Sequence, residues 1–333
     1  MSGPMRAETD FRDRFQDPSE EYVQRLVDAL NSLKEGELAV VELVACGKRA
    51  VEPLRRFLLY GKPNGIFQPR QHAVEALAEL GAKDVLLEYL AFEKQISDPV
   101  DRYGEEAVEN TAARLLGGWR DEDVYNALLR LLRRKPMPGV IETIGEYRRT
   151  ETIPDFIRAL GDDVAGGPAE EALRTVGEPA RRPLLNAALS PVPSAADETP
   201  SSLRRRASAL RLLADRNLSA EDWRNLAALT RDRDPEIAAR ACWIALLVAE
   251  DSCRRLAVRR LVEVLPEADL FLQTEMESWL VRRFDCARIV LDEEIARRQP
   301  ATEAVRSPDK VLRFLLAVKR RAESESRKGH DPE

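Results

Sequence analysis

One short pattern recurs along this chain at nearly constant spacing, and it constrains the fold more than any other feature. The segment HAVEALAELGA is rich in alanine and leucine and reaches its glycine at Gly81. Related segments place a small residue at the equivalent position along the chain: Gly47, Gly117, Gly145, Gly177, Ala214 and Ala249. The successive intervals are 34, 36, 28, 32, 37 and 35 residues. Chance similarity between helices would not maintain this spacing, so the pattern is an internal repeat.

Each repeat contains two amphipathic helices. One is leucine-rich, as in DVLLEYLAFE, and the other is the alanine-rich segment that ends in the glycine. In the alanine-rich helix, Ala73, Ala76, Leu77 and Leu80 share one face. The closing glycine is expected to adopt a left-handed conformation. A single pair has too little buried surface to be stable alone, so neighbouring pairs are expected to stack and share one core. The sequence therefore predicts an all-α fold, an α-solenoid of about seven helix pairs in one domain.

The paired helices and the closing pattern A-x-x-A-L-x-x-L-G resemble HEAT repeats. They are most similar to the short, alanine-rich bacterial kind named after phycobilisome lyase subunits. The resemblance covers about residues 37–265. We expect residues 1–36 to contain an N-terminal segment with a capping helix, residues 266–322 to form closing helices, and residues 323–333 to be a disordered tail.

Composition narrows the possible classes of protein. Apolar residues make up 44% of the chain and charged residues 33%, which is typical of a folded protein. No stretch approaches the roughly 20 uncharged apolar residues that span a bilayer, and the charged N-terminus does not resemble a secretion signal. We therefore expect a cytoplasmic protein. The net charge is −6 and only residues 201–333 are weakly basic, which makes a nucleic-acid partner unlikely.

In HEAT-like stacks the second helices of the pairs line the concave side, and the resemblance implies that a partner binds there. Register along these helices gives two rows of side chains that do not belong to the core. The first row is Glu75, Thr111, Gly139, Glu171, Ser208 and Trp243, and the second is Ala78, Arg114, Glu142, Arg174, Arg211 and Leu246. They form either a solvated face of mixed charge or a groove in which the arginines meet anionic groups of a partner.

Trp243 and three long connections are further candidates for contact. Trp243 lies in CWIALLVA, where it either packs in the core or anchors a partner. Segments 61–69 and 97–106 offer Ile66, Phe67 and Tyr103 as apolar contacts on one edge, unless these rings fold back onto their own repeats. Segment 190–202 is rich in serine and proline and is expected to be mobile.

Three consecutive arginines, Arg204 to Arg206, follow segment 190–202 at the expected start of a helix. Cations are unfavourable at a helix N-terminus. An anionic group, such as a carboxylate, is therefore expected close to them.

Motifs for catalysis are scarce. The chain has two histidines, and neither has a partner at metal-binding spacing; His72 is expected on a helix surface. No phosphate-binding loop, dinucleotide-binding motif or nucleophile elbow occurs. We expect no metal and no cofactor.

The sequence thus predicts a non-catalytic scaffold or adaptor that binds another protein. Two alternatives stay open because similar solenoids serve them. One is a bilin lyase-like role. The other is a nucleic-acid-binding role like that of solenoid DNA glycosylases, for which tryptophans and arginines are present but the acidic Glu75, Glu142 and Glu171 are unfavourable.

Overall fold

The computed structural model describes residues 18–32, 34–61, 66–92, 94–195, 197–304 and 309–328. This part of the chain is almost entirely α-helical, which confirms the all-α prediction. The described helices of the first half are α2 (Glu20–Ala29), α3 (Gly36–Ala45), α4 (Val51–Tyr60), α5 (Gln68–Glu79), α6 (Lys83–Ala91), α7 (Pro99–Leu116), α8 (Glu122–Arg134), α9 (Pro138–Gly145), α10 (Ile153–Ala159) and α11 (Gly166–Val176).

The helices of the second half are α12 (Arg181–Leu189), α13 (Pro200–Ala214), α14 (Ala220–Leu226), α15 (Pro235–Val248), α16 (Asp251–Val264), α17 (Leu270–Arg282), α18 (Phe284–Ala304) and α19 (Lys310–Lys328). Four short 3-10 helices precede or extend them: η1 (Gly47–Ala50), η2 (Thr150–Thr152), η3 (Glu178–Ala180) and η4 (Ala227–Arg231). A two-stranded hairpin, β1 (Pro193–Ser194) and β2 (Asp197–Glu198), is the only sheet among the described residues.

The chain forms two compact units instead of the single domain expected. The first comprises Met1–Phe156 and Gly167–Val176, and the second Ile157–Gly166 and Gly177–Glu333. Residues 323–328, expected to belong to a disordered tail, are helical, because α19 runs to Lys328. The last five residues lie outside the described part of the chain.

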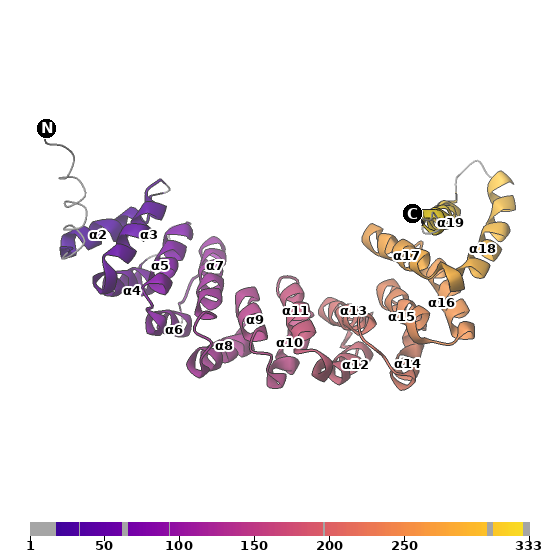
Figure 1. Cartoon of the computed structure of the whole chain (residues 1–333), viewed down its shortest axis with the longest axis horizontal. Coiled ribbons are helices and arrows are strands. Elements are labelled where there is room, and N and C mark those ends of the chain that lie inside the picture. Colours follow the sequence, from indigo (N-terminus) through magenta and orange to yellow (C-terminus); the bar gives the residue numbers. More distant parts are fainter. Residues whose placement is uncertain are drawn as a thin grey trace. The chain divides into compact units, whose positions relative to one another are not determined.

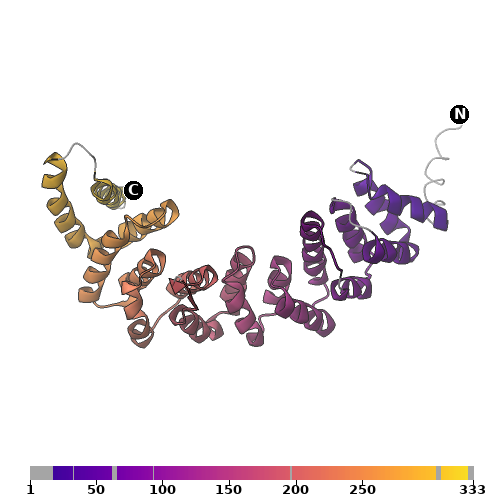
Figure 2. The ribbon, with the colours of Figure 1, turned by 180° about the vertical axis from the view of Figure 1, so that it is seen from behind.

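In the first unit the helices form two rows. Helices α3, α5, α7 and α9 contact one another in order, and α2, α4, α6 and α8 form the other row in the same way (Figure 1). Each pair also packs across the rows, α4 on α5 and α8 on α9, for example, as the view from behind shows (Figure 2). The apolar stripe predicted for α5 lies in this core, where Ala73, Ala76 and Leu77 have no exposed surface.

In the second unit α13 packs on α15 and α15 on α17, while α12 contacts α14. Toward the C-terminus, α16 packs on α18, and α19 packs on both α17 and α18. A continuous apolar core runs through α15 to α19 and includes Leu246, Met276 and Leu315. The segments expected to close the repeats are therefore part of the core of this unit.

The glycines of the repeat do not all have the expected role. Gly81 has a φ of 69°, the left-handed conformation that was predicted, and Gly47 and Gly177 also have positive φ. Gly117 and Gly145 are helical instead, and the positive φ occurs three residues later, at Arg120 and Arg148.

Close packing between helices explains this exception. A Cβ atom on Gly145 would lie 3.0 Å from the Cβ of Ala172, and one on Gly117 would lie 3.0 Å from Cγ2 of Thr143. These two glycines therefore allow neighbouring helices to approach, whereas the turn itself is made after them.

Two of the three predicted loops are ordered elements. Residues 99–106 belong to α7, and Asp98 caps it by accepting hydrogen bonds from the backbone N–H groups of Val100 and Asp101, at 2.8 and 3.1 Å. Residues 193–198, expected to be mobile, contain the β1–β2 hairpin, in which Pro193 pairs with Glu198.

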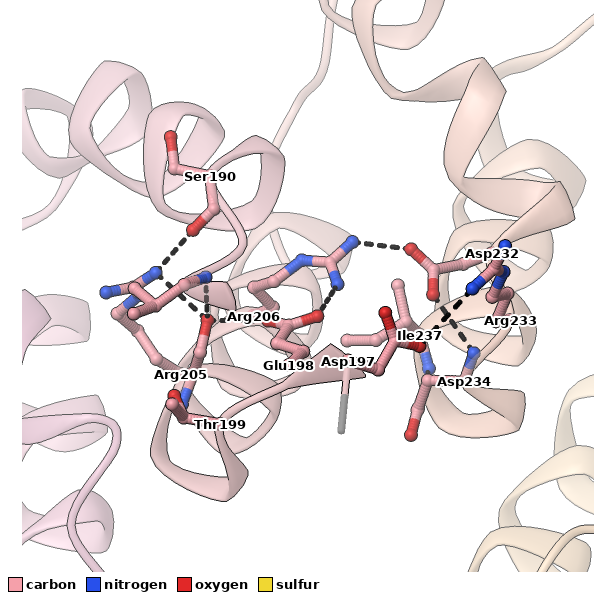
Figure 3. A network of polar contacts seen from close by, with 12 residues as sticks. Ser190, Asp197, Glu198, Thr199, Arg205, Arg206, Asp232, Arg233, Asp234 and Ile237 are labelled. Atoms are coloured by element: carbon pink, nitrogen blue, oxygen red, sulfur yellow. Dashed lines mark hydrogen bonds and ion pairs between the residues drawn. The ribbon is translucent and has the colours of Figure 1, made fainter. Parts of the chain in front are cut away.

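Arg206 ties this hairpin to the helices of the second unit (Figure 3). Its guanidinium is 3% exposed and lies 2.6 Å from a carboxylate oxygen of Glu198 and 2.6 Å from one of Asp232. Its Nε also donates to the carbonyl of Ala188 at 2.9 Å. Arg204 bonds Asp163 at 2.9 Å. Carboxylates do lie beside these arginines, as expected, and they come from the chain itself.

Candidate functional site

Large apolar side chains are exposed around one edge of the first unit, where α4 and α6 end and α5 and α7 begin. We call this group the aromatic edge; it consists of Tyr60, Ile66, Phe67, Phe92, Val100 and Tyr103. The rings of Tyr60 and Phe92 meet edge to face with their centroids 5.9 Å apart. Phe67 packs against α7, because a Cβ on Gly104 would lie 3.0 Å from its own Cβ. Exposed aromatic side chains that are held in place are common at protein-binding surfaces.

A group of buried charges lies beneath the aromatic edge. We call it the buried cluster; it consists of Arg70, Tyr89, Lys94 and Glu105. Arg70 on α5 and Glu105 on α7 are about 5% and 6% exposed, and Nε of the arginine lies 3.0 Å from Oε2 of the glutamate. The other carboxylate oxygen accepts hydrogen bonds from Tyr89 and Lys94, both at 2.6 Å. Both oxygens of Glu105 are therefore engaged inside the protein.

Arg70 and Lys94 also hold the C-terminal end of α4. Arg70 donates to the carbonyls of Leu58 and Gly61, and Lys94 donates to that of Leu58 at 2.9 Å. These carbonyls belong to the last turn of a helix, which has no intrahelical partners for them. The buried cluster therefore fixes the ends of α4, α5 and α7 relative to one another, and with them the backbone that carries the aromatic edge.

Burial shifts the pKa values of this cluster. Burial, together with the neighbouring Arg70, lowers the pKa of Lys94 to about 8. Burial raises the pKa of Tyr89 well above its ordinary value, and Glu105 adds to this effect. Burial alone would raise the pKa of Glu105, but Arg70 and Lys94 outweigh it and hold that pKa below its ordinary range. The glutamate is thus ionised at neutral pH and serves as the counter-charge for both cations.

A pocket of about 310 Å³ opens beside Phe92; we call it the edge pocket. The residues that line it come from the segment between α6 and α7, from α7 and from the end of α8: Phe92, Lys94, Gln95, Ile96, Arg102, Glu105, Glu106, Glu109, Arg134 and Lys135. Lys135 lies 2.5 Å from Glu106 and 3.9 Å from Glu109. Burial raises the pKa of Glu109. With Arg70 behind Glu105, the pocket holds more cationic than anionic side chains.

Three residues of the aromatic edge were already candidates for partner contact in the sequence. Ile66, Phe67 and Tyr103 were predicted as apolar contacts on one edge, and the structure places them in the aromatic edge with 43%, 45% and 75% of their surfaces exposed. Tyr103 lies on a helix and not in a loop. The buried cluster was missed. The available signal was Lys94 in AFEKQISDP, where a charged residue follows a helix end.

The predicted rows of the first unit consist mainly of side chains that bind one another. Nε of Arg114 on α7 lies 2.5 Å from Glu142 on α9. On α11, Arg174 lies 3.2 Å from Glu171. Glu75 accepts a hydrogen bond from Gln71 at 3.3 Å, and the hydroxyl of Thr111 donates to the carbonyl one turn earlier. Gly139 is buried against Asn110.

The rows of the second unit contain Ser208, Arg211 and Trp243. Ser208 is 7% exposed and accepts a hydrogen bond from Arg211 at 3.3 Å. Trp243 is half-buried against the core of α15 to α19. Its ring stacks on Trp279 of α17, with centroids 5.5 Å apart and planes at 8°. This geometry favours the core role over that of an exposed anchor.

His72 is not the surface residue that was expected. It is 8% exposed and faces the start of α3, where a Cβ on Gly36 would lie 2.9 Å from Nδ1 of the histidine. That nitrogen has no hydrogen-bond partner in the described part of the chain. The error arose because only one apolar stripe was assigned to this helix. In the structure α5 is buried over more of its circumference, and the buried part includes His72.

None of the helices that the structure describes is both long and apolar enough to cross a membrane. The described part of the chain contains no group of three or more histidine, cysteine, aspartate or glutamate side chains placed to hold a metal ion. The comparison with protein-family models finds no match for this chain, and the comparison with curated proteins finds no significant relative.

Proposed function

We propose that this protein is a non-catalytic, HEAT-like scaffold that binds another protein through the aromatic edge of its first unit. The observation that carries the proposal is the combination of exposed aromatic side chains with a buried cluster that holds them in place. Tyr60 is 63% exposed and Tyr103 75% exposed, although both belong to helices fixed by Arg70 and Glu105. Exposed rings on a rigid support lose little conformational freedom when they bind a partner.

The polar groups near this edge support binding in preference to catalysis. A general base needs a free lone pair within reach of a substrate. Both oxygens of Glu105 accept bonds from Arg70, Tyr89 and Lys94, and Lys94 itself donates to Leu58. The buried charges of Arg70, Lys94 and Glu105 thus hold the fold together.

We place the contact surface at the aromatic edge and not along the predicted rows. Arg114 and Glu142 lie on those rows and are paired with each other, and a partner would have to break this pair to use either. Binding at the aromatic edge breaks no ion pair of this kind, since the apolar surface there is already exposed. We place the protein in the cytoplasm, because its four cysteines are unpaired and disulfides are rare there.

Site-specific photocrosslinking tests this function. A benzophenone side chain at Tyr103 is expected to capture a distinct protein in the native cell, because this residue is the most exposed of the aromatic edge. The matched control is the same group at Ile289 on α18, which is 58% exposed in the second unit. Phe92→Asp should abolish the capture at Tyr103, since it places a charge in the apolar contact.

Equal capture from both positions would contradict the proposal, and so would capture that survives Phe92→Asp. The melting temperature of each variant shows whether it is folded. Phe92 is 38% exposed, so its substitution is expected to leave the fold intact.

A further inference from the structure

We infer that the edge pocket and the neighbouring segment Lys94–Ser97 bind an extended peptide of the partner that carries a carboxylate side chain. This inference rests on the proposed function and deepens it, because it names the form in which the partner enters the site. Three features of the described residues support it: open backbone groups, an excess of positive charge, and a rigid base.

The segment Lys94–Ser97 has unpaired backbone groups. It lies between α6 and α7 and is neither helix nor strand. The residues on both sides are extended, with ψ of 112° at Phe92 and 128° at Asp98. The backbone N–H and C=O groups of the four residues form no hydrogen bond with any residue that the structure describes. Such groups can pair with an added peptide strand.

Side-chain burial along the segment alternates as in a strand at a surface. Lys94 and Ile96 are half-buried, whereas Gln95 and Ser97 are exposed. Successive side chains of an extended chain point to opposite sides, so this pattern is that of a strand with one side against the protein. Lys94 and Ile96 both line the edge pocket. A peptide paired with this segment would therefore run along the pocket.

The charges that line the edge pocket determine which kind of peptide side chain fits there. Four cationic side chains line it (Lys94, Arg102, Arg134 and Lys135), against three carboxylates (Glu105, Glu106 and Glu109). Arg70 lies behind Glu105 and adds a fifth cation. Each lining carboxylate already lies within 4.0 Å of a lysine or arginine. The excess positive charge favours a carboxylate of the peptide, which guanidinium groups bind well.

The base of the site is held before any peptide binds. Nζ of Lys94 is fixed by Glu105 at 2.6 Å and lies 4.6 Å from the centre of the Tyr89 ring. The same nitrogen donates to the carbonyl of Leu58 on α4, so the Lys94 side chain joins the segment to that helix. A strand that is already positioned loses little entropy on pairing.

Selection of peptides on the full-length chain tests the inference. Phage-displayed random dodecapeptides are selected on the wild-type protein and counter-selected on the double variant Arg102→Glu, Arg134→Glu. Both arginines are exposed, and circular dichroism confirms that the variant is folded. We expect enriched peptides to contain aspartate or glutamate, and synthetic copies to bind the double variant about tenfold more weakly than the wild type. Replacing that acidic residue by its amide should have a similar effect.

Backbone methylation separates strand pairing from simple charge attraction. In a paired strand only alternate N–H groups face the partner strand. Methylating alternate amides of an enriched peptide should abolish binding in one set of positions and leave it nearly unchanged in the other.

Three results would overturn the inference: no enriched peptides, enriched peptides without acidic residues, or equal loss of binding from both sets of methylated amides. These results leave the proposed function intact as long as crosslinking at Tyr103 still depends on Phe92. The partner would then bind the aromatic edge through a folded surface. Loss of the crosslink together with normal peptide selection would instead show a peptide site that is not the contact for that partner.

Discussion

Glu105 balances two cations in a place where water is largely excluded. Breaking a buried ion pair by removing one partner costs more than the pair itself contributes, because the remaining charge stays buried without compensation. Here the remaining charges would be two, Arg70 and Lys94, which are close enough to repel each other. The stability of the first unit should therefore depend strongly on this one carboxylate.

Glu105→Gln is expected to lower the free energy of unfolding by about 3–5 kcal/mol. The matched control is Glu142→Gln, which removes the partner of Arg114 at an exposed position and should cost less than about 1 kcal/mol. Urea denaturation followed by circular dichroism measures both. Similar losses in the two variants would show that burial does not strengthen the contribution of Glu105.

The titration of Lys94 is a second property of the same cluster. Its pKa is about 8 in the folded protein, against an ordinary value of 10.5. The unfolded state therefore binds more protons between these pH values, so this lysine makes stability rise with pH across the window. Competitive labelling with acetic anhydride should give a midpoint near 8 for Lys94. Lys83 is the internal control, because its hydrogen bond to Asp121 raises its pKa; equal midpoints would contradict the assignment.

At the scale of single residues, the sequence predicted which apolar side chains are exposed better than it predicted which charged side chains pair. Ile66, Phe67 and Tyr103 were found because large apolar side chains stood in stretches that looked too long for a turn. The contact of Arg70 with Glu105 joins residues 35 positions apart, which the repeat interval of that region makes possible but does not specify. Many charged pairs share this interval, and only the packing shows which of them is buried.

Between elements, glycine residues determine how closely two helix backbones can approach each other. Gly139 at the start of α9 lies against α7, and a Cβ on it would be 2.4 Å from the carbonyl oxygen of Asn110. The side chain of Asn110 also accepts a hydrogen bond from the N–H of Gly139 at 2.7 Å. Because both contacts involve backbone atoms, the two helices would have to move apart to accept a larger residue.

Gly139→Ala should therefore destabilise the protein by about 1–3 kcal/mol. Gly167→Ala is the opposite case, since a Cβ there meets nothing within 4 Å. It should stabilise the protein by about 0.4–1 kcal/mol, because alanine restricts the unfolded chain. Thermal denaturation of the two variants checks the opposite signs. A stabilising Gly139→Ala would show that α7 and α9 can separate at no cost.

Close packing between helices also limits how well the sequence can predict the role of each glycine. The repeat correctly gave the helix pairs, and Gly81 has the left-handed conformation expected at the end of α5. For Gly145 the same position in the pattern was interpreted in the same way, but its role is to contact Ala172 of α11. A glycine at a helix end allows either role, and the choice depends on the distance to the next helix.

In each whole unit, helices mostly contact helices that are one or two places away along the chain. A local loss of stability should then stay near its origin, as it does in proteins built from successive layers. In Glu105→Gln, we expect faster amide hydrogen exchange in α5 and α7 than in the wild type, and little change in α15 and α17. Mass spectrometry of exchanged peptides measures this directly. Uniform acceleration along the chain would show instead that the protein unfolds as a single cooperative body.

The pair Trp243 and Trp279 gives the second unit its own optical signal. Two indole rings that are nearly parallel and 5.5 Å apart couple their electronic transitions, and the coupling depends steeply on their separation. Because one ring belongs to α15 and the other to α17, the near-ultraviolet circular dichroism of the native protein reports the spacing of these two helices. Bending of this unit by a bound molecule would be visible without any added label.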